Sequence, residues 1–115
     1  MLTPPRWEAE CRVMKHRLPT FESFAEPGVW AGFRGWFRGR RTGRVYEVIA
    51  QAPIRTYPSE EPAVYMSPHP EAHHWIRDGR LCYQREGHVW DPAADTFVQA
   101  LMIAAKYLDE FDGRG

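Results

Sequence analysis

The residues of this chain best suited to chemistry lie in one short stretch, residues 73–83 (HHWIRDGRLCY). It holds Cys82, one of two cysteines, and His73 and His74, which stand nine and eight residues before it. The Asp78-Gly79 pair between them is typical of a turn, which would fold the histidines back toward the thiol. A thiol with imidazole nearby has the composition of an activated nucleophile. The stretch therefore predicts that Cys82 is a nucleophile.

The same part of the chain allows a second interpretation, a zinc site. Imidazole and thiolate are ligands that zinc prefers, and four of them complete a tetrahedral site. The candidates fall between positions 69 and 88 and are His69, His73, His74, Cys82 and His88. Their spacing matches no familiar zinc signature. We therefore expect neither a metal nor a cofactor, and stoichiometric zinc that is lost on Cys82→Ser would overturn that expectation.

The length and composition of the chain favour some classes of protein over others. A chain of 115 residues is expected to form a single domain, residues 1–115, with one hydrophobic core. Fifteen basic and fifteen acidic side chains cancel, which argues against a dedicated nucleic-acid binder. No apolar run approaches the ~18 residues that a membrane span needs, and the first residues lack the apolar core of a signal peptide. We expect a cytoplasmic protein with free thiols and no membrane partner.

The N-terminal residues predict an amphipathic helix. Thr3 can cap its first turn, where Pro4 and Pro5 cost no hydrogen bond. Its apolar face is spaced at helical intervals and consists of Trp7, Cys11, Met14 and Leu18. We expect Cys11 to be a buried packing residue and Pro19 to end the helix.

After a connector through Pro27-Gly28 the pattern changes to the period of a strand. One face consists of Val29, Ala31, Phe33 and Phe37, and the other of Trp30, Arg34, Trp36 and Arg38. Residues 39–43 predict a turn, residues 45–50 the returning strand, and residues 63–66 a short third strand. Pro68 and Pro70 then predict an irregular path without a regular ladder.

The arginines around this turn leave three interpretations open. They are Arg34, Arg38, Arg40, Arg41 and Arg44, and they stand among glycines and aromatic residues. A solvated hairpin tip fits the zero net charge best, ahead of an acidic protein partner and of RNA. The sixteen aromatic residues are too many for the interior of so small a domain, so some should face a partner.

The last element is predicted to be a helix that begins at Pro92 or Thr96, with Asp91 or Asp95 as its cap, and ends at Phe111. Its buried stripe consists of Phe97, Leu101, Ala104, Leu108 and Phe111, widened by Val98, Met102 and Ala105. A stripe of that width is expected to pack on a sheet. The sequence thus predicts an α+β domain with helices against one face of an antiparallel meander.

Four features, in this order, resemble the ubiquitin-conjugating enzyme (UBC) family over nearly the whole chain. The amphipathic N-terminal helix is the first. The second is Tyr57-Pro58 followed by Pro62-Ala63-Val64, which resembles the family's passage into its third strand. Asp78-Gly79-Arg80-Leu81-Cys82 resembles its Gly-x-Ile/Leu-Cys active-site approach, and Trp90-Asp91-Pro92-Ala93 its Trp-Ser-Pro-Ala motif. The resemblance implies a UBC-like fold with an irregular active-site segment before the central helix.

The departures from the family pattern point to its compact bacterial members. Where eukaryotic enzymes carry His-Pro-Asn, this chain has Ala72, His73 and His74, so His74 replaces the Asn, and Tyr83 replaces the Leu that usually follows the cysteine. The sequence stops at Gly115, so we expect the two last helices of the eukaryotic enzymes to be absent. These features resemble conjugating-enzyme relatives from bacterial ubiquitin-like modification operons or cyclic-oligonucleotide anti-phage systems (CBASS).

The resemblance implies a function. Cys82 would accept the C-terminus of a ubiquitin-like protein, or of a CBASS nucleotidyltransferase, from an activating enzyme as a thioester. It would then pass that acyl group to an amine on a target protein. His74 would serve as oxyanion donor, loop organiser or base, with His73 and His88 as secondary candidates. The alternative is a catalytically silent UBC-like binding module, against which the presence of Cys82 argues.

Overall fold

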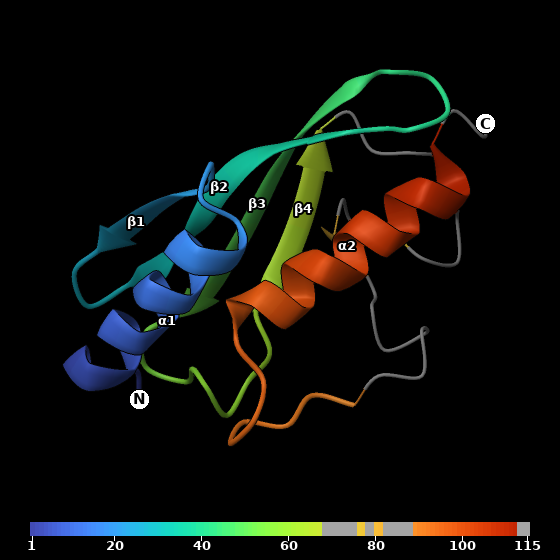
Figure 1. The fold of residues 1–115 in the computed structure, drawn as a ribbon. Helices are drawn as coiled ribbons and strands as arrows, with labels where there is room; N and C mark the ends of the chain where they lie inside the picture. The colour runs from blue at the N-terminus through green and yellow to red at the C-terminus, as the bar shows by residue number, and fades with distance from the viewer. Residues whose placement is uncertain (68–75, 78–79, 82–88, 113–115) are drawn as a thin grey trace.

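A computed structural model describes residues 1–67, 76–77, 80–81 and 89–112. This part of the chain is α+β, as predicted, with two helices and six strands (Figure 1). The elements in order are α1 (Pro4–Arg17), β1 (Glu22–Glu26), β2 (Trp30–Arg38), β3 (Val45–Pro53), β4 (Ala63–Ser67), β5 (Ile76–Arg77), β6 (Arg80–Leu81) and α2 (Phe97–Phe111). Neither helix has the length and apolar character that crossing a membrane requires.

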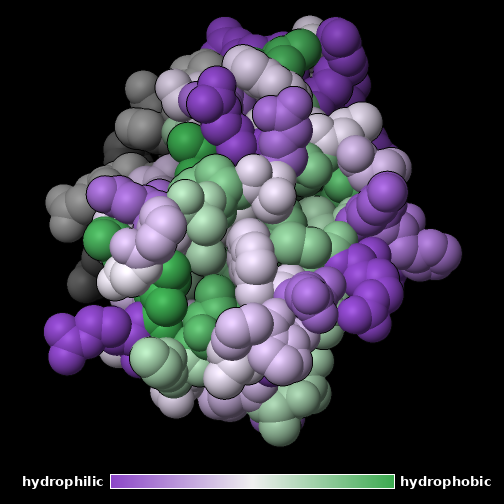
Figure 2. Space-filling model, turned by 90° about the vertical axis from the view of Figure 1, so that its left-hand side faces the viewer, coloured by the Kyte–Doolittle hydropathy of each residue, from purple (hydrophilic) through white to green (hydrophobic). Residues whose placement is uncertain are grey.

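The six strands form one antiparallel sheet in the order β1-β2-β3-β4-β6-β5. The first four follow one another as a meander, in which β2, β3 and β4 are the three strands that the sequence predicts. The long β2–β3 ladder runs from Trp30↔Pro53 to Arg38↔Val45. The short strand β6 pairs with β4 through Arg80↔Tyr65 and carries β5 on its other side. Both helices lie on the same face of this sheet (Figure 1). Seen from the side of α1 and β1, apolar residues gather across the middle of the molecule between hydrophilic margins (Figure 2).

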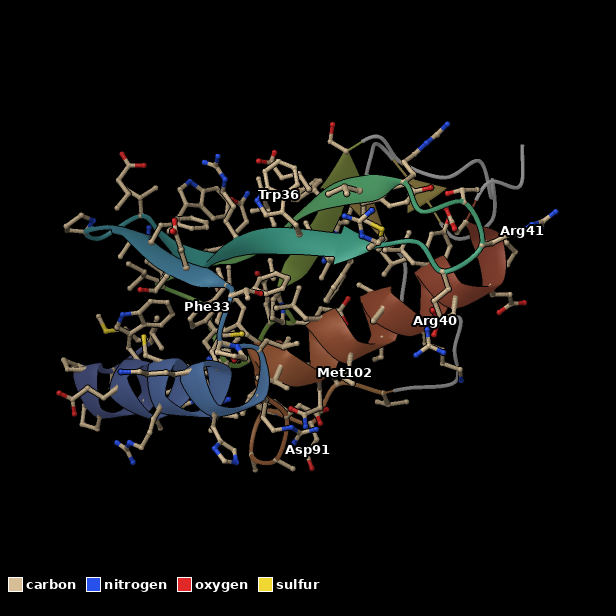
Figure 3. The ribbon with its side chains drawn as sticks, turned by 45° about the horizontal axis from the view of Figure 1, so that its top comes forward. Phe33, Trp36, Arg40, Arg41, Asp91 and Met102 are labelled. Atoms are coloured by element: carbon tan, nitrogen blue, oxygen red, sulfur yellow. The ribbon has the colours of Figure 1, made fainter. Side chains whose placement is uncertain are left out.

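The alternation predicted for residues 29–38 is confirmed from Trp30 onward, whereas Val29, predicted on the buried face, precedes β2 and is exposed. Phe33 is 1% exposed and lies on the helix side of the sheet, whereas Trp36 is 57% exposed and lies on the opposite side (Figure 3). The core joins one residue of α1, Met14, to the inward residues of β2, β3 and β4 and to α2. Burial of these apolar side chains is the main stabilising contribution to the fold.

The helix predicted at the N-terminus is confirmed, including its cap, since the Arg6 N–H donates to Thr3 Oγ1 at 3.3 Å. The residues that are buried on this helix differ in part from the prediction. Glu10 is 1% exposed and buried, while Cys11 is only half-buried. The face that contacts the rest of the molecule is therefore rotated toward Glu10.

Helix α2 begins at Phe97, with Thr96 as its N-cap, so the predicted caps Asp91 and Asp95 are wrong. Both aspartates serve the turn before the helix: Asp91 Oδ1 accepts from the Ala93 N–H at 3.0 Å, and Asp95 Oδ2 accepts from the Asp91 N–H at 2.9 Å. Thr96 is fixed by its N–H, which donates to Gln99 Oε1 at 2.8 Å.

The predicted stripe of α2 is confirmed at Phe97, Leu101, Ala104 and Leu108, and Val98 widens it as expected. Met102 was placed in that stripe wrongly, because its side chain is 44% exposed and lies away from the sheet (Figure 3). Ala100 and Tyr107 are buried instead.

Three strands were not predicted. The segment before Pro27-Gly28, taken as a connector, contains β1, and the section taken as irregular contains the two-residue strands β5 and β6. None shows a clear apolar alternation in sequence: β1 reads Glu-Ser-Phe-Ala-Glu, with four of its five residues exposed. Pairing with an established neighbour, rather than intrinsic preference, accounts for these strands.

Candidate functional site

The predicted site residues Cys82, His73, His74 and His88 lie outside the described residues, as does His69 of the zinc alternative. Their roles stay predictions. Among the residues that the structure does describe, no group of three His, Cys, Asp or Glu side chains could hold a metal ion. The described residues nearest to Cys82 in the sequence are Arg80 and Leu81 before it and Val89 and Trp90 after it.

The strand that precedes Cys82 in the sequence, β6, joins the sheet and the core. Leu81 is 1% exposed and belongs to the core, and its neighbour Arg80 pairs with Tyr65 of β4. Strand β5 pairs with β6 in antiparallel register, through Ile76↔Leu81 and Arg77↔Arg80. The chain therefore enters β5 and leaves β6 at the same end of this two-stranded unit.

A cavity of about 460 Å³ lies beside β6. The described residues that line it come from both sides of Cys82 in sequence and from the segment before β4: Ser59, Glu60, Glu61, Arg80, Val89 and Trp90. Arg80 Nη2 and Glu61 Oε1 form an ion pair at 3.6 Å. The Trp90 indole N–H donates to the Pro58 carbonyl at 2.7 Å, which anchors this residue to the segment before β4.

A buried carboxylate ties the two helices together. Glu10 Oε1 accepts from the Phe97 N–H at 3.0 Å, so a side chain of α1 satisfies the first turn of α2. Glu10 Oε2 accepts from Arg6 Nε at 3.0 Å and from the Tyr57 hydroxyl. The negative charge also meets the positive end of the α2 dipole, which is a favourable arrangement.

Arg6 connects this network to the segment that precedes α2. Its guanidinium donates to the Asp95 carbonyl at 2.6 Å and to the Pro92 carbonyl at 3.1 Å. Burial alone would lower the pKa of Arg6, but hydrogen bonds to Tyr57 and Glu10 raise it. Burial and the Glu10 charge raise the pKa of Tyr57, so this residue acts as a neutral donor.

Sequence reasoning missed this network, although one signal was present. Glu10 stands three residues after Trp7 and four before Met14, which places a carboxylate inside the predicted apolar face of the helix. A charged residue at such a position is buried only when it is paired and hydrogen-bonded. Arg6, one turn earlier, is the partner that this spacing indicates.

The second cysteine, Cys11, has the character of a packing residue. Burial raises the pKa of its thiol, and the charge of Glu10 raises it further, while a hydrogen bond with Ser23 lowers it. The net upward shift keeps the sulfur protonated at neutral pH, which is the opposite of what a nucleophile requires. Of the two thiols, only Cys82 retains the prediction of chemistry.

Comparisons with known proteins do not assign the chain to a family. No family model matches it, and neither a curated protein nor a solved structure matches it.

Proposed function

We propose that Cys82 carries an acyl group as a thioester and transfers it to an amine, in the manner of a compact bacterial ubiquitin-conjugating enzyme. The acyl group would be the C-terminus of a ubiquitin-like protein or of a CBASS nucleotidyltransferase, delivered by an activating enzyme. The target would be a protein amine, in the setting of anti-phage defence. The proposal rests on the ordered motifs of the sequence and on one structural observation.

That observation is the antiparallel pairing of β5 with β6. In the sequence, His74 precedes β5 by two residues and Cys82 directly follows β6, and the pairing sets the first residue of β5, Ile76, opposite the last residue of β6, Leu81. The cavity lined by Arg80, Glu61 and Trp90 at the border of this segment offers room for a chain terminus or an acceptor side chain.

The chemistry consists of two acyl transfers. The Cys82 thiolate attacks the activated C-terminal carbonyl, and the thiol of the activating enzyme leaves. An amine then attacks the thioester carbonyl, the Cys82 thiolate leaves as the amide forms, and the proton lost by the amine passes to that thiolate. Each step passes through an oxyanion, and an imidazole N–H of His74 is suited to donate a hydrogen bond to it.

Incubation with the cognate activating enzyme, its ubiquitin-like protein and ATP tests the first transfer. We expect an adduct on a non-reducing gel that dithiothreitol removes and that becomes thiol-resistant with Cys82→Ser. Cys11→Ser is the matched control, because the same change at a packing thiol should leave the adduct unchanged. Absence of an adduct with a proven activating enzyme, or its loss on Cys11→Ser alone, would contradict the proposal.

Replacement of His74 by Ala separates a chemical role from a structural one. Loss of one oxyanion donor typically slows the chemical step about 10²–10³-fold. We therefore expect discharge of the thioester to a free amine to slow much more than its formation does. Single-turnover rates of loading and discharge measure the two steps, and equal effects on both would assign His74 to loop structure.

A further inference from the structure

The edge strand β1 is exposed along its whole length. It lies at the end of the sheet and, among the described strands, pairs only with β2, so half of its backbone N–H and C=O groups face away from the sheet. Four of its five residues are exposed, and only Phe24 is half-buried. An uncovered edge of this kind is a template on which another strand can pair.

The helix side of β1 is open as well. Ser23 and Ala25 face this side, since they stand opposite the buried residues Phe33 and Ala31, yet both are exposed. Their small side chains do not fill the space between β1 and α1. Figure 2 views this side of the molecule and shows apolar residues across its middle.

Two hollows lie in this space, one at each inward residue of β1. The first, of about 220 Å³, lies at Ala25 and is lined chiefly by apolar side chains that include Leu2, Trp7 and Ile54. The second, of about 290 Å³, lies at Ser23 and is lined by Cys11 and Lys15 among others. Ser23 and Ala25 are alternate residues of β1, whose Cα atoms lie roughly 7 Å apart, so one hollow lies at each of two successive inward positions.

The face of β1 that points away from the helices carries two negative charges. Glu22 and Glu26 are exposed at the two ends of the strand. Arg34, which stands opposite Glu22, is paired with Glu47 at 3.2 Å, and neither acid of β1 forms an ion pair with any described residue. A second copy pairing antiparallel about Phe24 would set Glu22 against Glu26 twice, which is unfavourable.

We propose that the groove between α1 and β1 binds an extended segment of a partner protein, which adds to the sheet as a strand beside β1. Two alternate side chains of this segment enter the hollows at Ala25 and Ser23, and the one at Ala25 is apolar. Basic side chains stand opposite Glu22 and Glu26. Backbone pairing of this type supplies affinity, and the alternate pockets supply specificity. The site is independent of any chemistry at Cys82.

A synthetic peptide tests the proposal. Its central sequence, Lys-Val-Thr-Val-Lys, is acetylated, amidated and flanked by Gly-Ser, and it presents the same pattern to β1 in either strand direction. Titration followed by NMR should shift the amide signals of residues 22–26 and the indole signal of Trp7. The register-shifted peptide Val-Lys-Thr-Lys-Val, of identical composition, should bind at least about tenfold more weakly, since its lysines face the hollows.

Two further comparisons separate strand pairing from simple charge attraction. The double variant Glu22→Lys/Glu26→Lys should weaken binding about tenfold, whereas Glu110→Lys on the exposed surface of α2 should not. Alternate residues of a paired strand direct their backbone N–H groups toward β1 and away from it. N-methylation of the residues whose N–H groups face β1 should abolish binding, and N-methylation of the other residues should not. Absence of binding up to about 1 mM peptide, equal binding of both registers, or equal effects of both methylated sets would overturn the proposal. A dimer of the protein that the peptide disperses would assign the groove to a second copy and overturn it too.

Discussion

At the scale of single residues, a carboxylate without exposed surface joins three parts of the chain. Glu10 accepts from Arg6 on its own helix, from the Tyr57 hydroxyl and from the Phe97 N–H of α2. All of these donors are satisfied by one side chain, and the Arg6 guanidinium is its countercharge, with 23% of its surface exposed. Removal of the acceptor would leave a cation and two donors without their partner.

Glu10→Ala should therefore destabilise the protein by about 3–5 kcal/mol, the usual cost of breaking a buried charge pair on one side. Glu10→Gln should cost less, because one carbonyl oxygen remains for the Phe97 N–H. Urea unfolding at neutral pH measures both. Glu8→Ala, which removes an exposed carboxylate from the same helix, is the control and should stay within about 0.5 kcal/mol. An equal effect of Glu10→Ala and Glu8→Ala would show that the network does not stabilise the fold.

For the first helix, the sequence predicted the position of the helix better than the burial of its individual residues. The 3.6-residue period placed Met14 in the core correctly. It assigned Cys11 to the same face because a thiol counts as apolar, and it passed over Glu10 because a carboxylate does not. Burial of Glu10 depends on donors from Tyr57 and Phe97, which are distant in sequence, and no local pattern contains them.

At the scale of elements, the C-terminal end of α2 is fastened to the β2–β3 hairpin. The Asp112 carboxylate accepts from the Arg41 N–H at 3.1 Å, the Thr42 N–H at 2.9 Å and the Tyr46 hydroxyl at 2.8 Å. It lies against Gly39, where any side chain would collide with it. The ordered tip carries exposed arginines beside the acidic end of the helix, and Arg40 pairs with Asp109 at 3.4 Å. These contacts support the interpretation of the arginines as a solvated hairpin tip.

The pH dependence of stability should report this contact. Burial raises the pKa of Asp112, but the hydrogen bonds from Thr42, Tyr46 and Arg41 outweigh it and hold the pKa below its ordinary value of 3.8. The folded state therefore binds the proton less readily than the unfolded state. The stabilisation by Asp112 is present above pH 3.8 and is lost as the pH falls through the lower folded pKa.

Asp112→Asn should lower the melting temperature at neutral pH by roughly 5 °C, the scale of losing a capping carboxylate in a small domain. The difference from wild type should shrink as the pH falls below 3.8, because the unfolded wild-type chain takes up a proton there that the folded carboxylate still resists. Thermal melts at a series of pH values measure this. Asp109→Asn, at the exposed end of the same helix, should have little effect at any pH. A difference that stays constant into acid would refute the assignment.

Element boundaries show what one-dimensional patterns can and cannot predict. The sequence places α2 correctly to within its first turn, but Asp91, Asp95 and Thr96 are all good caps, and local preference does not rank them. The turn decides between them, because Asp91 and Asp95 are engaged by backbone N–H groups of the turn before the helix. Strand β1 was missed because its apolar content is low, and its existence depends on β2.

At the scale of the whole molecule, a carboxylate at each end of α2 connects the helix to another element. Glu10 of α1 fixes its N-terminus, and Asp112 fixes its C-terminus to the β2–β3 hairpin. Between these points the helix packs on the sheet through Leu101, Ala104 and Leu108. The order of elements and the single helical face of the sheet follow from the hydrophobic pattern, whereas these two fastenings depend on tertiary contacts.

The two fastenings should act independently, because 15 helical residues at 1.5 Å each separate them by about 22 Å. Substitutions that far apart with no shared partner usually add to within about 0.5 kcal/mol. A double-mutant cycle with Glu10→Gln and Asp112→Asn, followed by urea unfolding, measures the coupling between them. We expect the loss in the free energy of unfolding of the double variant to equal the sum of the two single losses. The slope of that free energy against urea concentration should stay unchanged. A coupling well above this limit would mean that α2 transmits changes from one end to the other. A change in the contacts of α1 would then alter the β2–β3 hairpin. We do not expect this, because Glu10 and Asp112 share no hydrogen-bond partner.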